Sequence, residues 1–290
     1  MSAFSEQRIA VTGGIELAVR RPEPPAGTTG GLPVLLVHGL SSNARLWDGV
    51  AGRLSAAGHP VAAVDQRGHG HSDKPDTGYD WATLTNDLAM VAAELGWPRL
   101  VAAGQSWGGN VVVELGARHG DLVGALALVD GGTIELADRF ADWPTCEAAL
   151  APPPLEGLDA QRFAKLIRSH HPDWPEEGIE GTLANVEVLA DGTVRPWLRR
   201  DNHLRILRGL YEHRPSQRWP ELRMPVALIP AEDATAPDGR FMAAKREEIR
   251  RAEKLLVDGR THWIVGDHDL HAQHPGEVAA ILAGLAAEAA

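Results

Sequence analysis

The chain has 290 residues, of which 44% are hydrophobic and 23% charged, and its formal net charge at pH 7 is −11. The length suits one large α/β domain or a domain that carries an insertion, and it excludes a minimal fold. The negative charge, without any basic cluster, argues against a general binder of nucleic acid or anionic membranes, because phosphate groups would be repelled.

Cys146 is the single cysteine, which excludes an internal disulfide and suits a reducing cytoplasm. Residues 1–20 lack the apolar core of a signal peptide, and no apolar run approaches the length of a membrane span. We therefore expect a cytoplasmic monomer or homodimer that acts on a small molecule, with neither nucleic acid nor a membrane as partner.

The N-terminal part of the chain reads as a hairpin, a loop and a buried strand. Arg8–Thr12 and Ile15–Arg20 flank a Gly-Gly pair, which predicts a β-hairpin. The Pro- and Gly-rich stretch Glu23–Gly31 is interpreted as a loop. The continuously apolar run Val34–Val37 is typical of a strand in a sheet covered on both faces.

Helix and strand patterns then alternate along the chain, and in places a glycine closes the helix. The expected elements are a helix over Trp47–Ala57, a strand over Val61–Val64, a helix over Trp81–Leu95, a strand over Leu100–Ala103, a helix over Asn110–His119 and a strand over Val123–Val129. This alternation predicts a parallel sheet with right-handed crossovers.

The alternation stops after Asp130. Residues 131–222 contain no continuous apolar strand, and prolines separate helical pieces such as Asp159–Ser169 and Asp201–His213. We interpret this block as an inserted helical cap over the carboxyl edge of the sheet, the edge at which open α/β sheets bind ligands.

The core pattern resumes after the insertion. Strands are expected over Val226–Ile229 and His262–Val265, followed by a final helix over Gly276–Ala289. The predicted core therefore consists of residues 1–130 and 223–290.

Nine tryptophans are an unusual number beside two tyrosines and four phenylalanines. Several lie in the inserted block, and they either line an apolar pocket or pack a helical lid onto the core. These are Trp143, Trp174, Trp197 and Trp219. Asn202 and His203, in a helical piece of the same block, face either the pocket or solvent.

Residues 104–108 read Gly-Gln-Ser-Trp-Gly, directly between a predicted strand and a predicted helix. In this context Gly-x-Ser-x-Gly is typical of a strained turn that holds a serine hydroxyl clear of the backbone. Ser106 is therefore a candidate nucleophile. The alternative is that Ser106 only caps the N-terminus of the helix.

A serine hydroxyl needs an adjacent base, and the base needs a third group that orients it. Among thirteen histidines, four cluster near the last expected strand: His262, His268, His271 and His274. A catalytic histidine belongs on the loop after that strand. His268 is therefore the favoured base, with His262, placed inside the expected strand, as the alternative and His271 third.

The acid should follow an earlier strand and accept the imidazole N–H. Asp233 follows the strand over Val226–Ile229 and is the favoured candidate. Glu232 and Asp238 lie on the same loop. Asp130, at the end of the strand after the Ser106 helix, is the main alternative.

Two backbone N–H groups are needed to stabilise an oxyanion. One is expected from Trp107, the residue after the serine, at a helix N-terminus. The other is expected from Leu40, in the loop His38-Gly39-Leu40 that follows the strand over Val34–Val37.

These motifs, together with the run Asp65–Ser72 and with His268 and Pro275, resemble the α/β-hydrolase fold superfamily, and most closely its capped esterases, lactonases and carbon–carbon bond hydrolases. The resemblance covers residues 8–130 and 222–289. It implies a mostly parallel eight-stranded sheet with helices on both faces and an inserted helical cap. It also implies that Asp65–Ser72 is a structural loop.

The chain departs from the family pattern in two places. Ala231-Glu232-Asp233-Ala234 replaces the usual Gly-x-x-Asp before the acid. The Ser-Trp-Gly-Gly turn is similar to that of proline iminopeptidases, but their glycine- and proline-rich oxyanion loop is absent, which argues against a peptidase.

The sequence thus predicts a serine hydrolase that needs no cofactor or metal ion and forms an acyl-enzyme on a small or medium carboxylic ester or lactone. Competing hypotheses are a carbon–carbon bond (diketone-type) hydrolase, an acyltransferase, and a binding protein without catalysis. Epoxide hydrolases and haloalkane dehalogenases of the same fold use aspartate where this chain has Ser106, so neither activity is expected.

Overall fold

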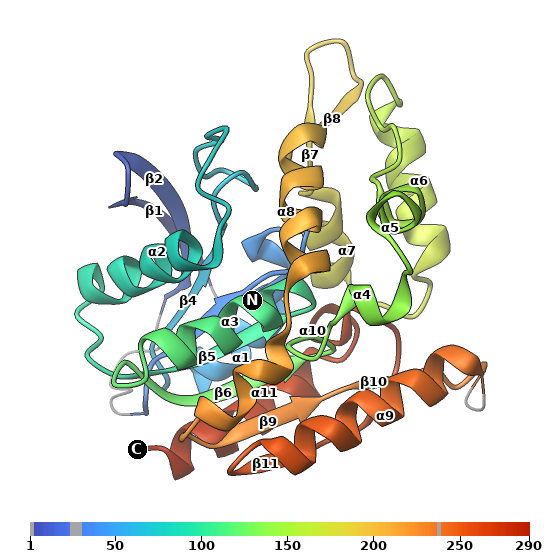
Figure 1. Cartoon of the computed structure of the whole chain (residues 1–290). Coiled ribbons are helices and arrows are strands. Elements are labelled where there is room, and N and C mark those ends of the chain that lie inside the picture. The colour runs from blue at the N-terminus through green and yellow to red at the C-terminus, as the bar shows by residue number, and fades with distance from the viewer. Residues whose placement is uncertain (1–2, 24–30, 237–238) are drawn as a thin grey trace.

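The computed structural model describes residues 3–23, 31–236 and 239–290, and is built around an eight-stranded sheet (Figure 1). The strand order is β1-β2-β4-β3-β5-β6-β9-β11. The strands are β1 (Phe4–Val11), β2 (Ile15–Pro22), β3 (Val34–Val37), β4 (Val61–Val64), β5 (Leu100–Gln105), β6 (Val123–Val129), β9 (Val226–Ile229) and β11 (Gly259–Thr261). The β1–β2 and β2–β4 pairs are antiparallel, and the remaining pairs are parallel.

Helices cover both faces of this sheet, because alternate residues of each central strand point to opposite sides. Val34 and Leu36 of β3 pack with α1 (Asp48–Ala56) and α11 (Pro275–Glu288). Leu35 and Val37 belong to the other core, which also contains residues of helices outside the segment between β6 and β9. These are α2 (Trp81–Glu94), α3 (Trp107–Arg118) and α9 (Arg240–Leu255). The predicted fold class is confirmed.

The segment between β6 and β9 adds no strand to the main sheet and extends away from it (Figure 1). It contains α4 (Leu136–Arg139), α5 (Trp143–Leu150), α6 (Ala160–His170), α7 (Glu176–Leu183), β7 (Val186–Val188), β8 (Val194–Pro196), α8 (Arg200–Glu212), η2 (Pro215–Gln217) and η3 (Trp219–Glu221). We call residues 131–222 the inserted segment. It is not wholly helical as expected, because β7 and β8 pair as an antiparallel hairpin.

The last part of the core differs from the sequence-based expectation. The predicted strand over His262–Val265 is replaced by β11, which ends at Thr261, and by β12 (Ile264–Val265), which pairs with β10 (Ala231–Glu232) outside the main sheet. The other short elements are η1 (Ala44–Trp47) and α10 (Leu270–Gln273).

Helix α9 was not expected from the sequence. Its buried residues Met242, Ile249 and Ala252, with Leu256 directly after it, recur at helical spacing, so the periodicity that indicates it was present. Most of the expected loop over residues 23–31 lies outside the described residues. Within the described ranges, no helix is long and apolar enough to cross a membrane.

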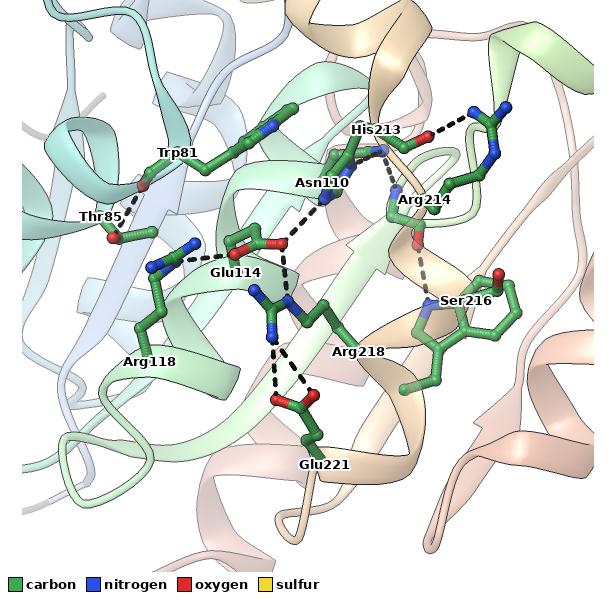
Figure 2. A network of polar contacts seen from close by, with 12 residues as sticks. Trp81, Thr85, Asn110, Glu114, Arg118, His213, Arg214, Ser216, Arg218 and Glu221 are labelled. Carbon is green, nitrogen blue, oxygen red and sulfur yellow. Dashed lines mark hydrogen bonds and ion pairs between the residues drawn. The ribbon is translucent and has the colours of Figure 1, made fainter.

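A buried carboxylate joins α3 to the end of the inserted segment (Figure 2). Glu114 accepts hydrogen bonds from Arg118 Nε at 2.8 Å, from His213 Nε2 at 3.0 Å and from Arg218 Nε at 3.0 Å. The other ring nitrogen of His213 pairs with Asn110 Nδ2 at 3.0 Å, and Asn110 Oδ1 accepts from Gly132 N. Helix α3 is thus tied to both ends of the inserted segment.

Burial raises the pKa of Glu114, but its hydrogen bonds to His213, Arg118 and Arg218 outweigh burial and lower that pKa to about 2. Because the folded pKa is depressed, the stability from this charge is complete above the ordinary pKa of about 4.5. It is lost as the pH falls from there through about 2.

We therefore expect Glu114→Gln to lower the free energy of unfolding by about 1–3 kcal/mol at pH 7, since an amide places a donor among three donors. The difference from wild type should shrink below pH 4.5. Urea unfolding at pH 7 and pH 3.5 measures the loss of unfolding free energy and its decrease at low pH. The control is Glu94→Gln on exposed α2 surface, expected to change stability by less than about 0.5 kcal/mol. A loss as small for Glu114→Gln would contradict this prediction.

Candidate active site

Ser106 occupies the turn between β5 and α3 in a strained backbone conformation, with φ 52° and ψ −122°. Its N–H donates to Val129 O at 3.0 Å, and its carbonyl accepts from Gly109 N at 2.9 Å. The hydroxyl makes no capping hydrogen bond to α3, so the helix-cap interpretation is wrong. The side chain instead lines a large cavity.

This turn exists because backbone atoms approach one another very closely around it. A Cβ atom added to Gly104 would lie 2.1 Å from Gly108 O, and one added to Gly131 would lie 2.2 Å from Ser106 O. No side chain fits at either distance. Glycines on both sides of the motif therefore permit the strained position of Ser106.

Of the three candidate bases His268, His262 and His271, His268 lies on the wall of the same cavity, and its partner is Asp130. Nδ1 of His268 lies 2.6 Å from Asp130 Oδ2. The second carboxylate oxygen of Asp130, Oδ1, accepts from Ala231 N at 2.9 Å and from Lys245 Nζ at 2.7 Å. The Asp130 side chain is 6% exposed, and it is held from three directions.

The expectation that Asp233 accepts the imidazole N–H is therefore wrong. Asp233 Oδ1 accepts instead from its own loop, from Thr235 N at 2.8 Å and from Thr235 Oγ1 at 2.7 Å. The neighbouring carboxylate of Glu232 pairs with Arg246 at 2.7 Å. Asp238 lies outside the described residues. The carboxylate that the structure brings to His268 is that of Asp130.

His262 and His271 lie elsewhere. His262 follows β11 and is exposed, and its backbone N–H donates to Leu228 O at 2.8 Å. His271 is fully buried against Trp47, with ring centroids 4.3 Å apart, and burial lowers its pKa to about 3. Neither lines the cavity that holds Ser106.

The loop that carries His268 is held by contacts from two directions. Gln105, next to the candidate nucleophile, donates from Nε2 to His268 O at 3.1 Å. From the inserted segment, Trp174 Nε1 donates to Asp267 Oδ2 at 2.9 Å. Both contacts place the loop, and neither was expected from the sequence.

The charges around His268 oppose one another. Burial lowers its pKa, but the hydrogen bond and the negative charge of Asp130 outweigh burial and raise the pKa above its ordinary value of 6.5; the Lys245 cation lowers it. For Asp130, burial raises the pKa, and the interactions with His268 and Lys245 reverse this effect and lower it. Each partner of the pair thus favours the charged form of the other.

The two expected oxyanion donors lie at the start of α3 and in the loop after β3. Trp107 is the first residue of α3, where a backbone N–H has no partner within the helix. Leu40 lies in the loop after β3 and lines the cavity beside Ser106. Among residues 3–23, 31–236 and 239–290, no hydrogen bond engages the N–H of either residue. The run Asp65–Ser72 is structural, since Asp65 accepts from Ala44 N and His71 N.

The cavity has a volume of about 2200 Å³. Its wall is largely apolar and comes from both the core and the inserted segment, including Leu40, Phe140, Leu150, Phe163, Trp197 and Phe241. Of the four tryptophans of the inserted segment, Trp197 lines it, whereas Trp219 is buried with its indole N–H on Gly132 O at 3.2 Å. Within the part of the chain that the structure describes, no cluster of three or more His, Cys, Asp or Glu side chains could hold a metal ion.

Three residues other than glycine have a positive φ in the described ranges, and all three line this cavity. They are Ser41 (φ 60°), Ser106 (φ 52°) and Asp130 (φ 40°). Such conformations cost about 1–3 kcal/mol each and persist where the surroundings impose them, often at functional sites. Backbone strain therefore marks the same edge of the sheet as the side-chain geometry does.

Comparison with known proteins identifies the family of this chain. Residues 33–177, half of the chain, match the family model of the alpha/beta hydrolase fold. A curated 2-(acetamidomethylene)succinate hydrolase of Mesorhizobium japonicum is 26% identical over 238 residues, covering 80% of this chain and 81% of the relative.

Solved structures show the same fold along nearly the whole chain. The crystal structure of E-2-(acetamidomethylene)succinate hydrolase has a TM-score of 0.74 and 23% identity, with 98% of this chain and 99% of that chain covered. The thioesterase domain from the curacin biosynthetic pathway has a TM-score of 0.76 and 19% identity, with 97% and 99% covered. The chain belongs to the alpha/beta hydrolase fold family. The predicted family and the general class of hydrolase are confirmed.

The opposing charges around His268 lead to a direct prediction. Asp130→Asn should lower the pKa of His268, because the carboxylate charge is lost, and Lys245→Met should raise it, because the cation that lowers it is removed. NMR titration of isotope-labelled histidine measures both changes. Asp233→Asn is the matched control and should leave the titration unchanged. Shifts of the same sign in the Asp130 and Lys245 variants would contradict this arrangement.

Proposed function

We propose that the protein is a serine hydrolase in which Ser106, His268 and Asp130 act as nucleophile, base and acid. The observation that carries the proposal is the His268–Asp130 pair on the wall of the cavity that also exposes the strained Ser106 turn. Nδ1 of His268 faces the carboxylate, which leaves Nε2 to take the proton of the Ser106 hydroxyl. Asp130 then stabilises the imidazolium that forms.

The reaction that we propose proceeds through an acyl-enzyme. Ser106 Oγ attacks the substrate carbonyl, and the Leu40 and Trp107 N–H groups stabilise the oxyanion. His268 returns its proton to the leaving group, and the acyl group stays on Ser106. Water, activated by His268, then releases the acid.

The substrate we propose is a carboxylic ester or lactone with a bulky apolar group. The cavity of about 2200 Å³ exceeds the roughly 300–1,000 Å³ that is typical of ligand pockets, and its wall is mostly apolar. This volume favours the upper end of the small-to-medium range expected from the sequence. The relative from Mesorhizobium japonicum is named for an acetamido compound, so a substrate panel should also include amides. We propose that the inserted segment acts as the cap of the site.

Labelling by a fluorophosphonate probe tests the nucleophile. Wild-type protein should be labelled at Ser106, because the probe phosphonylates activated serines. Ser106→Ala should not be labelled, and Ser169→Ala, which removes an exposed hydroxyl of α6, is the control that should label normally. Equal labelling of Ser106→Ala and wild type would refute the role of Ser106.

Turnover of aryl esters tests the acid. Asp130→Asn should reduce kcat by about 10³–10⁴-fold, because the amide no longer orients and stabilises the imidazole in its reacting form. Asp233→Asn should keep wild-type turnover, because its carboxylate serves only its own loop. A large loss of turnover in Asp233→Asn, with wild-type turnover in Asp130→Asn, would instead assign the role of the acid to Asp233.

A further inference from the structure

Ser41 is the third strained residue on the cavity wall, and the mechanism above does not use it. It lies in the loop after β3, at φ 60°, with an exposed side chain that lines the cavity. Its backbone N–H donates to His69 Nε2 at 3.3 Å. Its N–H is therefore already engaged, and the hydroxyl is what Ser41 offers to the cavity.

A histidine of the inserted segment orients this hydroxyl. Nδ1 of His203, on α8, lies 2.7 Å from Ser41 Oγ, and Nε2 of the same ring lies 3.4 Å from Leu150 O. A carbonyl oxygen only accepts, so Nε2 carries the proton and Nδ1 is the acceptor. Ser41 therefore donates its hydrogen to His203, and the lone pairs of Oγ are left facing the cavity.

The protonation of His203 supports this direction. Burial lowers its pKa to about 4, so the ring is neutral at neutral pH and one ring nitrogen carries no proton. A base this weak does not activate the Ser41 hydroxyl for attack at neutral pH. The Ser41–His203 pair therefore forms a fixed hydrogen-bond acceptor rather than a second nucleophile.

Ser41 also lies close to where the substrate carbonyl would react. Gly39, two residues earlier, packs on the nucleophile, since a Cβ atom at Gly39 would lie 3.1 Å from Ser106 Cβ. Leu40, the proposed oxyanion donor, is the adjacent residue, and adjacent Cα atoms are about 3.8 Å apart. A group that binds Ser41 Oγ is thus attached within a few bonds of the carbonyl.

We propose that Ser41 Oγ, held by His203, accepts a hydrogen bond from the substrate, which therefore carries an O–H or N–H donor beside its reacting carbonyl. This inference rests on the proposed function, because it concerns the substrate of the same site. It narrows the substrate class from apolar esters in general to those with a donor near the carbonyl. It also makes Ser41 a specificity-determining residue.

Two matched ester pairs test the inference, one with the donor on the acyl side and one with it on the alcohol side. The first is phenyl mandelate and its O-methyl ether, and the second is 2-hydroxyethyl and 2-methoxyethyl phenylacetate. Calorimetric binding is measured to Ser106→Ala, which does not turn the esters over. In at least one pair the hydroxyl ester should bind about three- to tenfold more tightly, as one neutral hydrogen bond allows.

Further substitutions, each added to the Ser106→Ala protein, show which residues cause the difference in binding within a pair. Ser41→Gly should bring the ratio of the two affinities in a pair to about one, and glycine tolerates the positive φ of this position. His203→Leu should also reduce it, whereas His203→Asn, with its amide oxygen in place of Nδ1, should preserve much of it. Ser169→Ala, an exposed serine of α6, is the control and should keep the ratio.

Equal binding within both pairs, or a ratio that survives Ser41→Gly, would overturn the inference. Failure of the proposed function has a different signature. In that case wild-type Ser106 is not labelled by the fluorophosphonate probe, while the binding ratio and its dependence on Ser41 persist.

Discussion

The site depends on one packing constraint, the close approach of backbone segments at the carboxyl ends of β5 and β6. Gly131 lies so near to Ser106 that a Cβ atom there would be 2.2 Å from the serine carbonyl oxygen. This contact, with the hydrogen bond from Ser106 N to Val129 O, holds the serine in a conformation that an unconstrained chain would leave. The strain is sustained by the buried parallel strands on either side, so the hydroxyl stays in the cavity without a partner on α3.

The same edge of the sheet determines the electrostatics. Asp130 directly follows β6, and the burial of its side chain would by itself favour the neutral carboxyl. Lys245 from α9 and His268 from the loop after β12 reverse that preference. The carboxylate is therefore kept charged by groups from two later parts of the chain. A charge placed this way costs little reorganisation when a neighbouring imidazole gains a proton.

The inserted segment holds parts of the core in place as well as lining the cavity. Trp174 holds the loop of His268 through Asp267, and His203 orients Ser41 after β3. His213, at the end of α8, reaches α3 through Glu114. The three contacts join the segment to three different regions of the core, namely the loop of His268, the loop after β3, and α3. A change of its packing would therefore alter the geometry of the site together with the shape of the pocket.

Local patterns determined most of the fold and the positions of two candidate site residues, Ser106 and His268. The alternation of apolar strands and helices, and the glycines around Ser106, act over a few residues, so the sequence alone predicted the sheet, the strained turn and the loop of His268. The carboxylate partner of His268 was not predicted in this way, because the sequence favoured Asp233 and the structure places Asp130 there. Asp130 and His268 are 138 residues apart, and they meet because β9 lies beside β6 and the following chain turns away to form β10. Strand order and backbone turns decide such a contact, and the residues near Asp233 do not determine either of them.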